Sequence, residues 1–393
     1  MKCFFASGSR SPRWRSRLKK KAMLNSEDTE RFRLPDGSRF QGWRPETAWT
    51  RDWWVDGAAP DGGDGTEHAP FRTIGAAAEV VQPGERVLVR PGVYRETVRP
   101  RRGGEGPGAM IAFESIEPGG AVITGEAELP AEWTPSTGWR SGDAAVTSWM
   151  TRVPRSLFAP GENPLAMPNK PETGWHSPIL ERLRIYNQRR ALVFQDGVRL
   201  QQALDFTELQ RMPGAFWPEP DGRILHVHPR TGSGIEESRF TLTVREQGLA
   251  PDEPELGYIA VRGFRFEKFG NVFPFKPQAG ALSTWRGHHW IIEDNRFAWI
   301  NGTGADIGKW DARASEPEVL GHHVVRANVF RNIGICGLAG LWLPHSLIDG
   351  NVFEDCCWHD VEPMFESAGM KFHWTDGTVI CRNIFRRIPF GPA

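Results

Sequence analysis

The chain has 393 residues, enough for a large hydrophobic core and for more than one domain. Its 48 basic and 48 acidic residues balance, so the composition indicates no nucleic acid or other polyanion as a partner of the whole chain. No apolar run is long enough to cross a membrane, so we expect no membrane partner either.

Cysteine and tryptophan usage restrict the class of protein further. The five cysteines match no zinc-binding spacing, and two of them are adjacent. We therefore expect reduced, buried thiols in a cytoplasmic protein with no metal and no cofactor. Seventeen tryptophans against three tyrosines suit either stacking on flat sugar rings or ordinary core and loop packing.

The N-terminal segment differs in character from the rest. Residues 1–22 carry eight basic and no acidic residues, and the apolar stretch Cys3–Ala6 is too short for a secretory signal. We predict a disordered basic extension over residues 1–39, whose first part precedes the true start at Met23. The alternative is a tail that binds nucleic acid.

Residues 40–129 contain short apolar runs between Gly and Pro. The segment 64–81 predicts a turn followed by a short helix, and strands are expected around Val87–Val89, Val93–Glu96, Ile111–Phe113 and Ala121–Ile123. A helix before the first strands suits a solenoid, because the first coil would otherwise expose an apolar end. Residues 40–129 are therefore predicted as a cap and the first coils.

Residues 130–250 lose the coil pattern. Asp196-Gly197 and Asp221-Gly222 lie between apolar runs and are strong hairpin signals. We predict an inserted antiparallel β-sandwich here. His226 and His228 alternate in one of its strands and are predicted on the surface.

Residues 251–393 contain a phrase that occurs four times: two apolar residues, two variable residues, Asn, any residue, Phe. Its asparagines are 33, 23 and 32 residues apart, which indicates coils of about 22 residues with occasional insertions. The pattern predicts an all-β fold, a right-handed parallel β-helix with the inserted sandwich. The Asn should form a ladder at a left-handed bend and the Phe an interior column. The pairs are Asn295 and Phe297, Asn328 and Phe330, Asn351 and Phe353, and Asn383 and Phe385.

One stretch gathers the residues best suited to chemistry. Residues 355–376 combine acids with Lys371, His373 and Trp374. Strand alternation places Lys371 and His373 on one face, where two donors beside Glu366 suit a hydroxyl-rich ligand. The alternative is a solvated loop with a Glu366–Lys371 salt bridge. Asp306 and Lys309, in a glycine-rich segment predicted as a coil turn with surface side chains, are weaker candidates.

Several motifs resemble the β-xylosidase family of retaining glycoside hydrolases, whose members have a parallel β-helix with an inserted sandwich. The resemblance runs from about Asp56 to the end of the sequence, and its most specific motif is Glu366-Ser-Ala-Gly-Met-Lys371-Phe-His373. It implies that Glu366 is an active-site carboxylate and that Lys371 and His373 line a sugar pocket. Other matching motifs are Asp64-Gly65, Pro91 to Glu96, Phe158 to Pro164, Tyr258 to Phe264, Trp290 to Asn295, Gly308-Lys309 and Cys336 to Gly340.

The chain also departs from that family. The resemblance places the nucleophile in a Trp-Leu-Asp-Trp phrase one coil beyond Lys371 and the proton donor another coil on, and neither has a counterpart here. Retaining hydrolysis needs both carboxyl groups, roughly 5 Å apart. We therefore predict glycoside hydrolase ancestry with an oligosaccharide or polysaccharide ligand, an inactive and C-terminally incomplete chain, and self-association. The alternatives are a polysaccharide lyase and a non-catalytic glycan-binding or structural β-helix.

Overall fold

The structure is a computed structural model. It describes residues 32–34, 36–40, 42–136, 147–166, 191–232, 234–271, 279–308, 320–358 and 367–389. The chain divides into two compact units, Met1–Gly42 and Trp43–Ala393. In the first unit, an antiparallel bridge joins Arg33 and Arg39; the predicted disorder of residues 1–31 lies outside the described residues.

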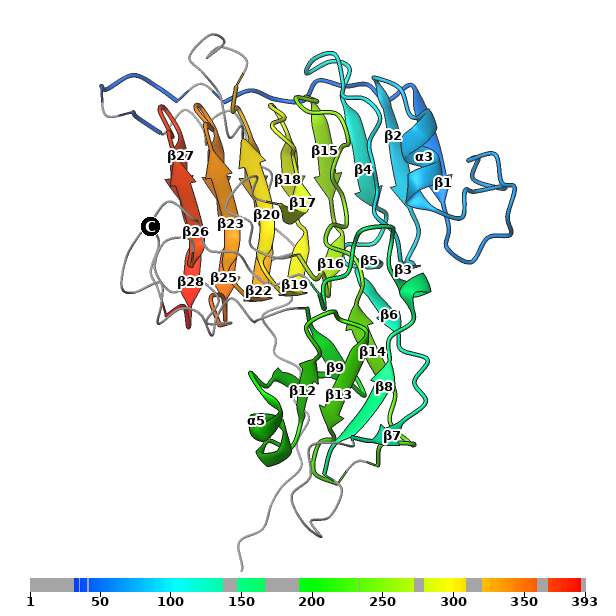
Figure 1. Cartoon of the computed structure of the whole chain (residues 1–393). Helices are drawn as coiled ribbons and strands as arrows, with labels where there is room; N and C mark the ends of the chain where they lie inside the picture. Colours follow the sequence, from blue (N-terminus) through cyan, green and yellow to red (C-terminus); the bar gives the residue numbers. More distant parts are fainter. Residues whose placement is uncertain are drawn as a thin grey trace, which may run out of the picture. The chain divides into compact units, whose positions relative to one another are not determined.

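The second unit contains three parallel sheets that each coil visits in turn (Figure 1). Sheet 1 consists of β1 (Arg51–Val55), β2 (Glu85–Val89), β4 (Ile111–Ser115), β15 (Ile259–Arg262), β18 (Ile291–Glu293), β21 (Val324–Arg326), β24 (Leu347–Asp349) and β27 (Val379–Cys381). Sheet 2 consists of β3 (Gly92–Tyr94), β5 (Ala121–Thr124), β16 (Arg265–Glu267), β19 (Arg296–Ile300), β22 (Val329–Ile333), β25 (Val352–Glu354) and β28 (Ile384–Arg386). Sheet 3 consists of β17 (Gly280–Ser283), β20 (Thr303–Gly308), β23 (Cys336–Leu341) and β26 (Ala368–His373). The predicted parallel β-helix is confirmed.

Helix α3 (Ile74–Val80) packs against β1 and β2, as the predicted cap requires. The Thr73 side chain accepts a hydrogen bond from the backbone of Ala76, and the Glu96 carboxylate accepts from Ile74 and Gly75 at 2.9 and 2.8 Å. These contacts satisfy backbone donors that a helix start leaves without intrahelical partners. Ile74 is fully buried in the core that runs through the solenoid.

An asparagine ladder fixes the corner between sheets 1 and 2. The side-chain oxygen of Asn328 accepts hydrogen bonds from the backbone and side-chain nitrogens of Asn295 at 3.0 and 3.2 Å. Asn351 accepts from Asn328 in the same way at 3.0 Å for both bonds, and Asn383 accepts from Asn351 at 2.9 and 3.0 Å. The predicted ladder is confirmed.

The left-handed bend lies one residue earlier than predicted. The residues before the four asparagines have positive φ: 56° at Asp294, 55° at Ala327, 64° at Gly350 and 55° at Arg382. Because the preceding residue makes the bend, the asparagine backbone N–H can donate to the next asparagine along the ladder.

The phenylalanines form the expected interior column. The rings of Phe266, Phe297, Phe330, Phe353 and Phe385 stack at centroid distances of 5.1, 4.6, 4.9 and 5.0 Å, with interplanar angles of 8° or less. These distances match the spacing of neighbouring strands, so each coil contributes one ring. The first four rings are fully buried.

Sheet 3 approaches this column through glycine. A Cβ on Gly337 would lie 2.7 Å from a ring atom of Phe353 and 2.4 Å from the carbonyl oxygen of Gly369. Gly304 meets Phe330 in the same way. A side chain at these positions would displace the column or the next strand, so the sheet closes against the aromatic rings only with glycine there.

Residues 126–244 contribute two smaller sheets, called the inserted domain below (Figure 1). Sheet 4 consists of β6 (Glu126–Glu128), β9 (Val193–Gln195), β10 (Val198–Arg199) and β14 (Phe240–Thr243). Sheet 5 consists of β7 (Thr134–Pro135), β8 (Trp149–Arg152), β11 (Gln201–Gln202), β12 (Ala215–Pro218) and β13 (Ile224–His228); the 3₁₀ helix η1 (Arg155–Leu157) follows β8. Val193, Phe216, Leu225 and Leu242 from both sheets share one hydrophobic core.

Two details of this domain differ from expectation. The pairs β9–β10 and β12–β13 are antiparallel at the predicted Asp-Gly turns, but β11 and β12 pair in parallel because helix α5 (Phe206–Arg211) connects them. His226 was predicted on the surface but is 1% exposed. Its Nδ1 lies 2.9 Å from Ser136 Oγ. In the described part of the chain, no helix has the length and apolar character needed to cross a membrane.

Candidate functional site

Sheet 3 brings two of the predicted site residues into one outward row. The strand register aligns Ser283 with Asp306, Asp306 with Ala339, and Ala339 with Lys371. Asp306 and Lys371 are two strands apart, so their backbones are separated by about 10 Å. His373, two residues after Lys371, points to the same side, while Phe372 packs against the solenoid core. This is the alternation predicted from the sequence.

The position of Asp306 corrects the sequence prediction. Its segment was expected to be a coil turn with surface side chains, but it is strand β20, and Asp306 is only 8% exposed. One carboxylate oxygen accepts from the backbone of Gly280 at 2.5 Å and the other from the hydroxyl of Ser283 at 2.8 Å. Burial raises the pKa of Asp306 to about 7, so the group gains or loses a proton near neutral pH.

Two tryptophans extend the outward surface at the end of sheet 3. Trp342 and Trp374 follow β23 and β26, and their rings stack at 4.7 Å with an angle of 19°. Trp374 is 53% exposed and lies 6.0 Å from the His373 ring. Both tryptophans have positive φ, 53° and 51°, which is unusual for a bulky side chain. Strained backbone that presents an exposed aromatic surface is a reason to suspect a binding role.

The remaining predicted site residues are not placed by the structure. Glu366 and Lys309 lie outside the described residues, so the predicted carboxylate and the alternative Glu366–Lys371 salt bridge both stay predictions. Trp342 was missed in the sequence because nothing in its own coil marks it. Its signal is its place one residue after β23, which corresponds to Trp374 after β26.

Sequence reasoning also missed an aromatic ladder at another corner. The rings of Tyr258, His289, His322 and His345 stack at 4.6, 4.4 and 5.2 Å, and Trp43 packs edge-on against His289 at 5.3 Å. Burial and the neighbouring histidines His322 and His288 lower the pKa of His289 to about 3. This ladder consists of neutral imidazoles at neutral pH and holds coils together.

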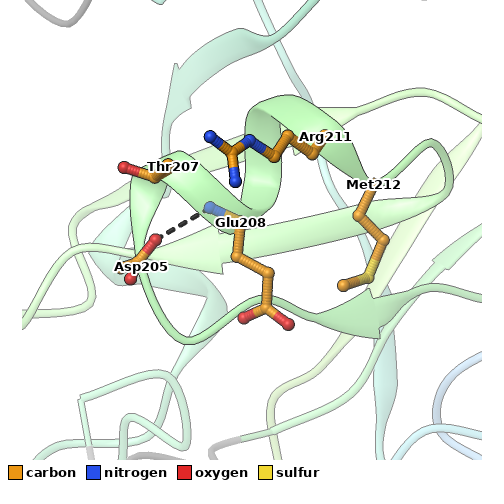
Figure 2. Close-up of a pocket in the computed structure, with 5 residues that line it drawn as sticks. All are labelled: Asp205, Thr207, Glu208, Arg211 and Met212. Atoms are coloured by element: carbon orange, nitrogen blue, oxygen red, sulfur yellow. Dashed lines mark hydrogen bonds between the residues drawn. The ribbon is translucent and has the colours of Figure 1, made fainter.

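A hollow of about 350 Å³ on the inserted domain has a structural explanation (Figure 2). It is lined by acidic residues at the start of α5. The Asp205 carboxylate accepts from the backbone of Glu208 at 2.8 Å, and the Glu208 carboxylate accepts from the backbone of Leu204 at 2.7 Å. Both acids therefore cap the helix. Among the described residues, no group of three or more His, Cys, Asp and Glu side chains is arranged to hold a metal ion.

Comparison with known proteins supports the fold. No family model matches the chain. The structure of XylC, solved in complex with xylose, superposes with a TM-score of 0.70 at 21% identity, covering 85% of this chain and 58% of XylC. The lacto-N-biosidase of family GH136 from Eubacterium ramulus gives a TM-score of 0.46 at 13% identity, covering 86% of this chain and 52% of that one.

One sequence relative is short in its match. The uncharacterized protein YwoF of Bacillus subtilis (strain 168) is 37% identical over 78 residues, which is 19% of this chain and 16% of YwoF. The chain thus spans little more than half of XylC and a small part of YwoF. The resemblance predicted from the sequence is confirmed at the level of the fold: this chain and XylC share one solenoid architecture.

Proposed function

We propose that this protein is carbohydrate-active and binds short xylose-type oligosaccharides on the outward side of sheet 3, in the manner of a retaining β-xylosidase. The observation that carries the proposal is the exposed Trp342–Trp374 stack beside His373. A pyranose ring has an apolar face that packs on an aromatic ring, and hydroxyl groups at its edge that need hydrogen-bond partners. The fold shared with XylC, which was solved with xylose, supports the same ligand class.

Each residue has a distinct role in this proposal. Trp374 supplies the stacking surface. The Lys371 ammonium donates to sugar oxygens, and His373 donates or accepts according to its tautomer. Glu366 is assigned the active-site carboxylate by the family resemblance alone. Asp306, buried and bonded to the neighbouring strand, fixes the position of β20 relative to β17.

Binding is tested by calorimetric titration of xylose, xylobiose and xylotriose. We expect Trp374→Ala to weaken binding about tenfold, because loss of an aromatic contact of about 1–1.5 kcal/mol corresponds to that factor. Ile380→Ala is the matched control: Ile380 is 44% exposed on β27, in the same coil but on sheet 1. Equal affinities for the native, Trp374→Ala and Lys371→Ala proteins would overturn the proposal.

Turnover is a separate question, and aryl β-xylosides answer it. We expect these 393 residues to hydrolyse them no faster than buffer, because the sequence includes neither carboxylate of the family's catalytic pair. Ordinary turnover would place both carboxyl groups among the acids of residues 355–376. A calcium-dependent rise in absorbance from an unsaturated sugar product would instead favour the lyase alternative.

A further inference from the structure

A second surface hollow, of about 380 Å³, lies on the inserted domain. Its volume is in the range of small-ligand sites in proteins. It is lined by Arg199, Gln201, Pro213, Gly214, Arg230 and Thr231. The lining thus contains two guanidinium groups, an amide and a hydroxyl, but no carboxylate.

Arg230 differs from the other arginines around it. Arg223 and Arg239, also on the inserted domain, each pair with a carboxylate, whereas Arg230 has no ion-pair partner within the described part of the chain. Its backbone N–H donates to the side-chain oxygen of Gln195 at 2.9 Å, which fixes the start of the side chain. Gly214, at φ +78°, approaches that side chain so closely that a Cβ would lie 3.3 Å from Arg230 Cγ.

Arg199 is held in place by aromatic rings of the solenoid. Its guanidinium carbon lies 4.2 Å from the ring centre of Trp358 and 5.9 Å from that of Trp299. A guanidinium stacked on an aromatic face still presents N–H donors at its edge, and its orientation is set in advance. Trp358 follows β25 in the coil that continues into β26, the strand of Lys371 and His373. The hollow therefore adjoins the coil that carries the proposed sugar site.

We propose that this hollow binds the carboxylate of an acidic sugar, a uronic acid residue attached to or part of the glycan. The proposal rests on the proposed function for the choice of a sugar. Paired guanidinium forks match a carboxylate in geometry and charge. The Gln201 amide and the Thr231 hydroxyl suit the hydroxyl groups of a pyranose ring better than they suit a bare inorganic anion.

The experiment is a calorimetric titration of the full chain with glucuronic acid, glucose and inorganic phosphate. We expect glucuronic acid to bind at least tenfold more tightly than either of the others. Arg230→Gln should weaken glucuronic acid binding at least tenfold, and Arg199→Lys, which keeps the charge but loses the fork, should weaken it less. Arg223→Gln, which removes a nearby arginine paired with Asp221, is the control and should bind as the native protein does.

Two outcomes would overturn the proposal: glucuronic acid affinity unchanged in Arg230→Gln, or phosphate binding as tightly as glucuronic acid, which would mark a simple anion site. Thermal melting of each variant confirms that it is folded. Neutral xylobiose distinguishes this proposal from the proposed function: its affinity should be unchanged in Arg230→Gln and reduced in Trp374→Ala. Failure of either substitution alone therefore identifies which proposal is wrong.

Discussion

Replacing Asn328 by alanine tests whether the asparagine ladder stabilises the solenoid. The Asn328 side chain accepts from the backbone and side chain of Asn295 and donates to Ile292 O at 2.8 Å and to Asn351 Oδ1 at 3.0 Å. The substitution leaves the buried Asn295 backbone N–H without its acceptor, at a cost of about 1–3 kcal/mol. The other lost bonds add about 0.5–1.5 kcal/mol each. We expect the free energy of unfolding to fall by about 3–5 kcal/mol.

The assay is urea unfolding followed by far-ultraviolet circular dichroism, with thermal melting as a second probe. Ala327→Gly is the matched control, since Ala327 is exposed, adjacent in sequence and already at φ 55°, where glycine is tolerated. Its free energy of unfolding should change by less than about 1 kcal/mol. A loss below about 1 kcal/mol in Asn328→Ala would refute the reasoning, because it would mean that the ladder adds no more than water would.

Further predictions concern packing, pH and charge. Gly337→Ala should lower the melting temperature and disturb the Phe353 ring, measured by melting and near-ultraviolet circular dichroism; an unchanged melting temperature would contradict the close approach. Because the pKa of His289 is about 3 in the fold and near 6.5 unfolded, its contribution to stability is complete above pH 6.5 and is lost as the pH falls toward 3. The buried carboxyl groups with raised pKa act in the opposite direction, so the comparison is with His289→Phe, which should show a weaker loss in acid. Arg326→Ala should lower stability more at low than at high salt, because it removes a 2.6 Å contact with Glu293; no salt dependence would contradict this.

The sequence was informative about sheets 1 and 2 because their strands border a repeated phrase. Asn and Phe recur in that phrase for separate physical reasons, one as a ladder at a corner and the other as an interior column. Sheet 3 carries no such phrase. Its strands β20 and β23 are built from glycine, alanine and a few larger residues, and all their residues are buried, so neither a period of two nor an apolar run distinguishes them from a turn.

The candidate site was predictable to the extent that it depends on strand alternation. Lys371 and His373 share a side because they are two residues apart in β26. Asp306 was misjudged because a carboxylate in a glycine-rich segment suggests an exposed turn, whereas here it accepts hydrogen bonds from the neighbouring strand. The Trp342–Trp374 contact could not be derived without the register, since residues 32 positions apart meet only when the coil length between them is known.

The distribution of charge explains why the ligand site is proposed on sheet 3. On sheet 1, outward charges pair along the solenoid axis: Glu114 contacts Arg262 at 2.6 Å, and Glu293 lies between Arg262 and Arg326 at 3.3 and 2.6 Å. On sheet 2, the Glu354 carboxylate contacts Arg387 at 2.7 Å.

A ligand at either of those faces would have to compete with existing ion pairs, at the cost of leaving a charge unpaired. The outward row of sheet 3 instead contains the small side chains of Ser283 and Ala339, followed by an exposed aromatic stack. Segments 272–278, 309–319 and 359–366 all adjoin strands of sheet 3 in the chain, and binding residues in proteins are concentrated on such connections. The solenoid thus uses two faces for its own stability and leaves the third to recognise a ligand.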